Sequence, residues 1–230
     1  SFMIVGMIEE FSKFWVMRKS GKQFFSSIDD VMQLSIIVAI GFAFAENILN
    51  PTYFVGFVKE YLVRPESPEW GAFLGNVMGR AVLTNMVHIV STGLLGYFYG
   101  LVLFAEPLIE EAEKEGHGFF VPAFFHKLLR LPKKFVFRRE MFFFGFFSAI
   151  TLHGLFNFLV TLPDMLPGNP RTIGDLLGAS PESLLHMVAI LLIPSLFYVV
   201  GGFWLLSTLF YKKENMKKHG HLVTTDTFVM

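Results

Sequence analysis

The sequence predicts an all-α membrane protein, a polytopic bundle of transmembrane helices. Of the 230 residues, 53% are hydrophobic and 17% are charged, and 29 are phenylalanine. A soluble domain of this size carries more charge and less aromatic surface. Several apolar runs reach the roughly 18–20 residues that are needed to cross a bilayer. We expect about five spans, at residues 1–18, 31–49, 72–105, 140–162 and 184–211.

The first of these spans opens the chain partway along a helix. Residue 1 is Ser, and no charged segment precedes the apolar stretch, so this stretch is not a signal peptide. We therefore expect further helix upstream in the full gene product. Residues 1–230 are expected to form a single membrane-embedded domain. Because the chain has no cysteine, a disulfide framework is excluded.

The connections between the spans differ in charge and so predict an orientation. Residues 18–30, the loop 106–139 and the tail after Tyr211 hold most of the 19 Lys and Arg residues. Short loops with a basic excess face the cytoplasm, which places the loop and the tail there. Within the loop, residues 126–139 mix basic and apolar side chains. This composition fits an interfacial helix or a solvated linker with a basic stop, and both alternatives stay open.

Polar clusters interrupt the apolar runs, where charge is costly. An ionisable side chain near the middle of a membrane helix costs at least about 2.5–3.5 kcal/mol, so such residues usually face one another or a wet cavity. The clusters are Glu9, Glu10 and Lys13; Glu46 and Asn47; Arg80; His88 and Thr92; and His153 and Asn157.

The first cluster has the spacing Glu-Glu-x-x-Lys. Glu9 and Lys13 are i,i+4 neighbours on one helix face, and Glu10 points about 100° away. One carboxylate can be held as an ion pair while the other serves as a general base. The alternative is a helix that ends early and leaves the pair in the headgroup region. The same spacing recurs at 110–114, in a polar loop beside further glutamates, where a solvated charge run is expected.

The other clusters supply partners for these carboxylates. Glu46 and Asn47 come late in the second span, where snorkelling of the carboxylate to water is the alternative reading. We expect Arg80 to neutralise one carboxylate. His88 and Thr92 are i,i+4 neighbours in the third span, and His153 and Asn157 are i,i+4 neighbours in the fourth. Two such imidazoles need a shared partner, which the glutamates provide. His186 is expected to be structural, hydrogen-bonded to a neighbouring helix.

In order along the chain, the motifs are Glu-Glu-x-x-Lys, Phe-x-x-x-Glu-Asn, His-x-x-x-Thr and His-x-x-x-Asn, each on its own span. This set resembles the PrsW family of intramembrane proteases, over about residues 9–157. The wider group includes the CAAX-processing membrane proteases, whose Glu-Glu-x-x-x-Arg would require Arg where this chain has Phe14. Lys13 therefore favours the PrsW branch.

The resemblance implies an all-helical fold and hydrolysis of peptide bonds in membrane-anchored proteins, which in bacterial relatives include anti-sigma factors. Glu9 or Glu10 would be the general base, and His88 and His153 would orient the water and the developing oxyanion, to which Asn157 would donate. We expect the lipid bilayer as a further partner and no nucleic acid.

Two chemical alternatives stay open for the same residues. Carboxylate oxygens of Glu10 and Glu46 with the imidazoles of His88 and His153 would suit Zn²⁺ with an open water position. The family is grouped with metallopeptidases, but the sequence has no His-Glu-x-x-His helix, so a metal-free mechanism is equally open. The rival function is a transporter or channel that uses Glu, His and Arg to handle protons or a solute. Transporters often show repeated halves, and this sequence shows none.

Overall fold

The computed structural model is mostly helical over the residues that it describes, which are 2–21, 25–49, 52–63, 80–116 and 118–218. Within these ranges, the only β pairing is an isolated bridge between Thr172 and Ala189. The prediction of an all-α fold is therefore confirmed.

Among the described residues, four helical segments are long and apolar enough to cross a membrane. They are Ile28–Leu49, Val82–Leu103, Lys133–Met165 and Leu192–Tyr211. The first is α2 (Ile28–Leu49), and the second is α5 (Asn85–Leu103) with the end of a π-helical turn, Arg80–Thr84, before it. The third is α8 (Lys133–Met165). The fourth joins α10 (Leu192–Leu196), a second π-helical turn (Phe197–Gly201) and the start of α11 (Gly202–Lys218).

The ends of these helices differ in places from the predicted ones. Residues 72–79 of the expected third span lie outside the described residues. The last span begins at Leu192 rather than at residue 184, because Leu184–Met187 forms a separate 3₁₀ turn whose first amides are capped by the Ser183 hydroxyl. The apolar composition of this stretch is the same in either conformation, so it could not reveal the break.

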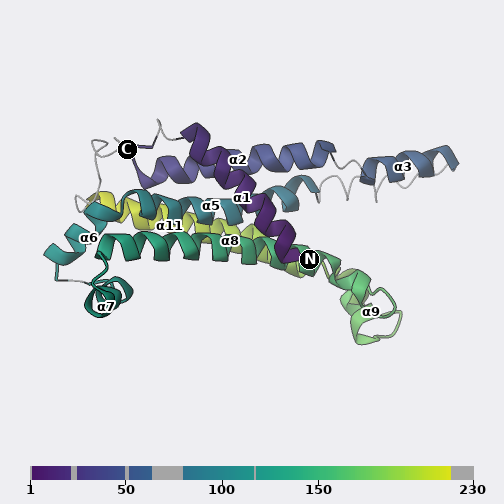
Figure 1. The fold of residues 1–230 in the computed structure, drawn as a ribbon. Helices are drawn as coiled ribbons and strands as arrows, with labels where there is room; N and C mark the ends of the chain where they lie inside the picture. The colour runs from purple at the N-terminus through teal and green to yellow at the C-terminus, as the bar shows by residue number, and fades with distance from the viewer. Residues whose placement is uncertain (1, 22–24, 50–51, 64–79, 117, 219–230) are drawn as a thin grey trace.

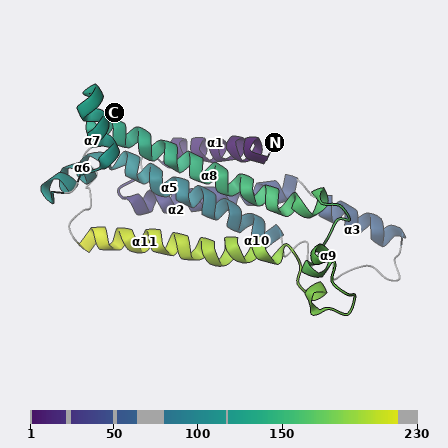
Figure 2. The same ribbon diagram turned by 90° about the horizontal axis from the view of Figure 1, so that it is seen from below.

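The predicted first span is α1 (Phe2–Gly21), a helix of 20 residues that crosses the other long helices at an angle (Figure 1). Glu9, Glu10 and Lys13 lie at its middle. Its outward face is apolar, with the side chains of Ile4, Ile8 and Trp15 all more than half exposed. Such a face suits contact with lipid. On the far side of the bundle from α1 lies α11 (Figure 2).

Glycines allow α5 to approach both of its main neighbours. A Cβ at Gly96 would lie 2.1 Å from Ser35 Oγ of α2, and a Cβ at Gly100 would lie 2.8 Å from a side-chain carbon of Ile28. Small residues four apart permit this kind of close packing between membrane helices. On its other side, α5 meets α8 at Gly145. This packing holds the helices that carry Glu46, His88 and His153 together.

A second close approach sets the position of α1. A Cβ at Gly6 would lie 3.3 Å from the backbone nitrogen of Gly154 and 3.4 Å from Cβ of His153. The two helices therefore touch nearly backbone to backbone, one turn before Glu9 and Glu10. This contact decides which side chains of α1 reach His153.

The shorter helices lie at the two ends of the bundle (Figure 1). At one end are α6 (Ala105–Lys114) and α7 (Phe120–Leu129). At the other are α3 (Thr52–Val63) and α9 (Ile173–Leu177), and His186 contacts α9 through the Thr172 hydroxyl and Asp175, as expected of a structural histidine. The expected interfacial helix at 126–139 is not a separate element, because α7 ends at Leu129 and α8 already begins at Lys133.

Candidate active site

The predicted polar clusters converge between α1, α2, α5 and α8. The rings of His88 and His153 lie 4.9 Å apart, centroid to centroid, although they come from different helices. The carboxylates of Glu9 and Glu10 approach them from α1, and Glu46 approaches from α2. The expectation that buried charges would share one location therefore agrees with the geometry.

Glu10 is fully buried and completely supplied with donors. Its Oε1 accepts hydrogen bonds from Lys13 Nζ at 2.6 Å and from His153 Nδ1 at 2.9 Å. Its Oε2 accepts from the Thr92 hydroxyl at 2.9 Å. Buried charges persist where they are paired and hydrogen-bonded in this way. Glu10 is thus the anchor that ties α1 to α5 and α8.

Glu9 is in the opposite situation. Its Oε2 is buried and has no hydrogen-bond partner among the described residues. The same oxygen lies 3.2 Å from His153 Nε2 and 4.0 Å from His88 Nδ1. Lys13 Nζ is also 4.0 Å from it, so the cation pairs with Glu10 at i,i+3 more closely than with Glu9 at i,i+4. Buried polar atoms without a partner are rare and call for an explanation.

Each histidine has a carboxylate on the nitrogen that points away from Glu9. His153 Nδ1 donates to Glu10, and His88 Nε2 donates to Glu46 Oε2 at 2.8 Å. Because a carboxylate only accepts, these contacts assign the single proton of each imidazole in its neutral form and leave His153 Nε2 and His88 Nδ1 as acceptors. Lys13 Nζ, 2.7 Å away, donates to the latter.

The result is a set of acceptor atoms turned toward one another. Donor atoms of Glu9, His88 and His153 all lie within 4.8 Å of one another. Many catalytic zinc sites use two imidazoles and a carboxylate as ligands. In such sites a carboxylate often accepts a hydrogen bond from the other nitrogen of a ligand imidazole and fixes its orientation. The unpartnered oxygen of Glu9 and the acceptor nitrogen of His153 fit a divalent cation, and His88 Nδ1 would join them on exchanging its hydrogen bond from Lys13 Nζ for the cation. The set differs from the expected one, since Glu9 takes the place of Glu10 and Glu46 stands behind His88.

Asn157 and Asn47 lie on the helices that carry the site residues. Asn157 is half-buried on α8, one turn after His153, and Asn47 is half-buried beside Glu46. The side chain of Arg80 lies outside the described part of the structure, so its expected role is a prediction still. Phe42 packs against the site, with its ring centroid 4.7 Å from Lys13 Nζ.

One buried residue near the site carried no sequence signal. Tyr198 belongs to the π-helical turn before α11, and its hydroxyl donates to the carbonyl of Leu152 at 2.5 Å. Its ring packs edge-on against Phe156 of α8. It therefore contacts the turn of α8 that presents His153. In the sequence it stands inside an apolar run, beyond the last motif.

The family comparison agrees with this site. A family model described as the PrsW family intramembrane metalloprotease matches residues 1–199. Searches among curated proteins and among solved structures each gave no match. The match covers most of the chain and includes every helix that contributes to the site, and four helices suit a membrane span. The chain is an integral membrane protein and belongs to the PrsW family of intramembrane metalloproteases.

Proposed function

We propose that this protein is an endopeptidase that hydrolyses membrane-anchored proteins at the site formed by Glu9, His88 and His153. One observation carries the proposal. The buried Oε2 of Glu9 has no donor among the described residues and lies 3.2 Å from a histidine nitrogen that is itself an acceptor. Two acceptors at this distance call for a shared proton or a cation between them.

The residues of the site have different roles in hydrolysis. The Glu9 carboxylate takes up the proton of the attacking water, since its buried Oε2 has no donor among the described residues. Glu10 and Glu46 hold the two imidazoles in orientation. The Asn157 side chain, one turn from His153, donates to the oxyanion that develops on the carbonyl. If Zn²⁺ is the resident cation, Glu9, His88 and His153 would hold it, in place of the proton-acceptor role of Glu9 and of the hydrogen bond from Lys13 to His88, and it would supply Lewis-acid polarisation of that carbonyl.

The experiment uses the purified protein in lipid vesicles with a single-span, membrane-anchored protein as substrate. His88→Ala and His153→Ala should each reduce cleavage by roughly 10²–10⁴-fold, because residues that act as one unit fail together. The matched controls are Glu110→Gln and Glu111→Gln in the Glu-Glu-x-x-Lys sequence of α6, which should cleave at the wild-type rate. Cleavage that survives the loss of either histidine, or that fails in the controls, contradicts the proposal.

Family membership and the geometry favour a protease over a transporter. A proton or solute path would need polar groups spaced along the membrane normal. The described ionisable side chains in the middle of the bundle instead meet at one point, and they are Glu9, Glu10, Lys13, Glu46, His88 and His153. Anti-sigma-factor-like proteins are the proposed substrates, on the strength of the sequence resemblance. The cytoplasmic placement of the 106–139 loop and the C-terminal tail is likewise part of the proposal, supported by the basic excess in these segments.

A further inference from the structure

The helix α7 stands apart from the rest of the bundle. It projects from the end where α8 begins, and its axis runs across that of α8 (Figures 1 and 2). With 10 residues, it is too short to cross a bilayer. A helix set across a bundle of spanning helices, at the end of that bundle, runs along the membrane surface rather than through it.

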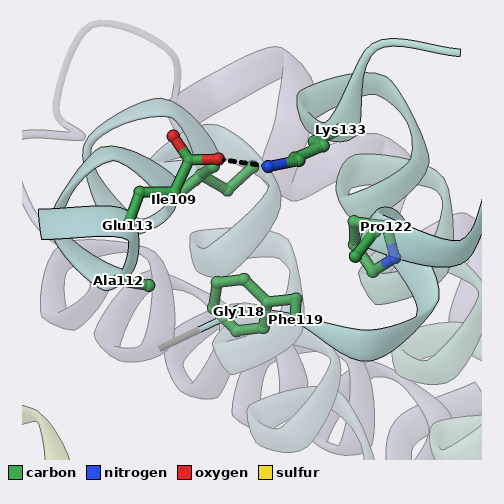
Figure 3. A pocket seen from close by; sticks show the side chains of 8 residues that line it. Ile109, Ala112, Glu113, Gly118, Phe119, Pro122 and Lys133 are labelled. Carbon is green, nitrogen blue, oxygen red and sulfur yellow. Dashed lines mark hydrogen bonds and ion pairs between the residues drawn. The ribbon is translucent and has the colours of Figure 1, made fainter. Parts of the chain in front are cut away.

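Short connections hold α7 at this place, beside an ion pair that joins α6 to α8. It is separated from α6 by residues 115–119 and from α8 by residues 130–132. Lys133 at the start of α8 pairs with Glu113 of α6 at 2.6 Å, across a pocket that Phe119 and Pro122 also line (Figure 3). The ring of Phe119 packs on Phe137, with centroids 4.7 Å apart. A few residues span at most about 3.5 Å each, so α7 cannot move far from the end of α8.

Most of the surface of α7 is unburied and apolar. Phe120, Phe124 and Leu128, at i, i+4 and i+8, are 81%, 50% and 62% exposed, and Pro122 is the helix's only buried residue. The exposed basic side chains Lys127 and Arg130 lie at the C-terminal end of this stripe. Large aromatic and aliphatic side chains next to basic ones are typical of helices that lie in a membrane interface.

We propose that α7 is a membrane-surface anchor whose stripe of Phe120, Phe124 and Leu128 inserts at the boundary between headgroups and acyl chains of an anionic leaflet. Lys127 and Arg130 bind the anionic headgroups. Charge complementarity selects this occupant, because a purely apolar protein partner would leave the two cations without counterions. The anchor does not depend on the activity proposed above, since none of its residues belongs to the site.

The chain contains no cysteine, so single cysteines can carry a spin label without a prior substitution. The probe is Phe124→Cys in vesicles of phosphatidylcholine and phosphatidylglycerol. One control is Glu110→Cys on the exposed side of α6, and the other is Phe203→Cys on α11, where the native side chain is 61% exposed. The label at 124 should collide with dissolved oxygen nearly as often as the label at 203, and with an aqueous nickel chelate far less often than the label at 110.

Two results would overturn the proposal. A label at 124 as accessible to nickel as the label at 110 would show that the helix lies in water. A label shielded from both oxygen and nickel would show that protein, such as a second copy, covers the stripe.

A separate experiment tests whether Lys127 and Arg130 bind anionic headgroups. Replacing phosphatidylglycerol by phosphatidylcholine should raise the nickel accessibility of the label at 124 by about twofold or more, since each basic residue near the surface adds attraction to anionic lipid. Lys127→Gln combined with Arg130→Gln should abolish this dependence. If the variant responds to lipid charge as the wild type does, the two side chains do not bind the headgroups.

Discussion

The hydroxyl of Thr92 offers a sharp test of the network around Glu10. It donates to Glu10 Oε2 at 2.9 Å, and both residues are fully buried. Replacing Thr92 with Val keeps the shape of the side chain but removes the only donor to that oxygen among the described residues. A hydrogen bond to a charged group contributes about 1.5–3 kcal/mol. We therefore expect Thr92→Val to lower the free energy of unfolding by about that amount, with Lys13 and His153 still bound to the other oxygen.

The matched control is Thr208→Val on α11. Its hydroxyl also donates at 2.8 Å, but to the Trp204 carbonyl on an exposed face, so its loss should change stability by less than about 0.5 kcal/mol. Reversible unfolding in mixed micelles of detergent and denaturing surfactant, followed by circular dichroism, measures both variants under the same conditions. If the two substitutions have equal effects, the Thr92–Glu10 bond does not support the fold and the anchor assigned to Glu10 is wrong.

Two further predictions address the packing of α1 against α8 and the hydrogen bonds of Asp175. Gly6→Leu should separate α1 from α8 at Gly154, which should reduce stability by about 1–3 kcal/mol and slow cleavage. The control Gly41→Ala, where a Cβ meets nothing within 4 Å, should change neither stability nor cleavage. Equal behaviour of the two variants would refute the close approach. Hydrogen bonds from Thr172 keep the pKa of Asp175 below its ordinary value, so their stabilising effect is present above about pH 4 and is lost as the pH falls through the lowered pKa. Amide hydrogen exchange in residues 172–178 should accelerate on acidification in the wild type but not in Asp175→Asn.

The long helices were predictable from the sequence because an apolar run of bilayer length has few alternatives. Predicted and observed spans agree over α2 and over most of α8. The start of the last span was not predictable, since Ser183 and the 3₁₀ turn after it leave no mark in hydropathy. Burial and composition therefore determine where a span exists, while local hydrogen bonds determine where it begins.

The members of the site were predictable, but not the division of roles between Glu9 and Glu10. Spacing on a helix brings Glu9 and Lys13 together, yet Lys13 lies 2.6 Å from Glu10 and 4.0 Å from Glu9. The difference arises from the crossing of α1 over α8 at Gly6, which points Glu9 at the imidazoles. A contact between residues almost 150 positions apart leaves no periodic signal in a single sequence, and the contact of Tyr198 with α8 was hidden for the same reason.

The most direct test of the account compares Glu9→Gln with Glu10→Gln in one preparation, with unfolding and substrate cleavage measured for each. Glu9→Gln should unfold as the wild type does and lose cleavage by roughly 10²–10⁴-fold, because it removes the proton acceptor and little else. Glu10→Gln should lose about 3–5 kcal/mol of stability, because it breaks a buried ion pair and leaves Lys13 without its counterion. Wild-type cleavage by a folded Glu9→Gln protein would contradict the central claim.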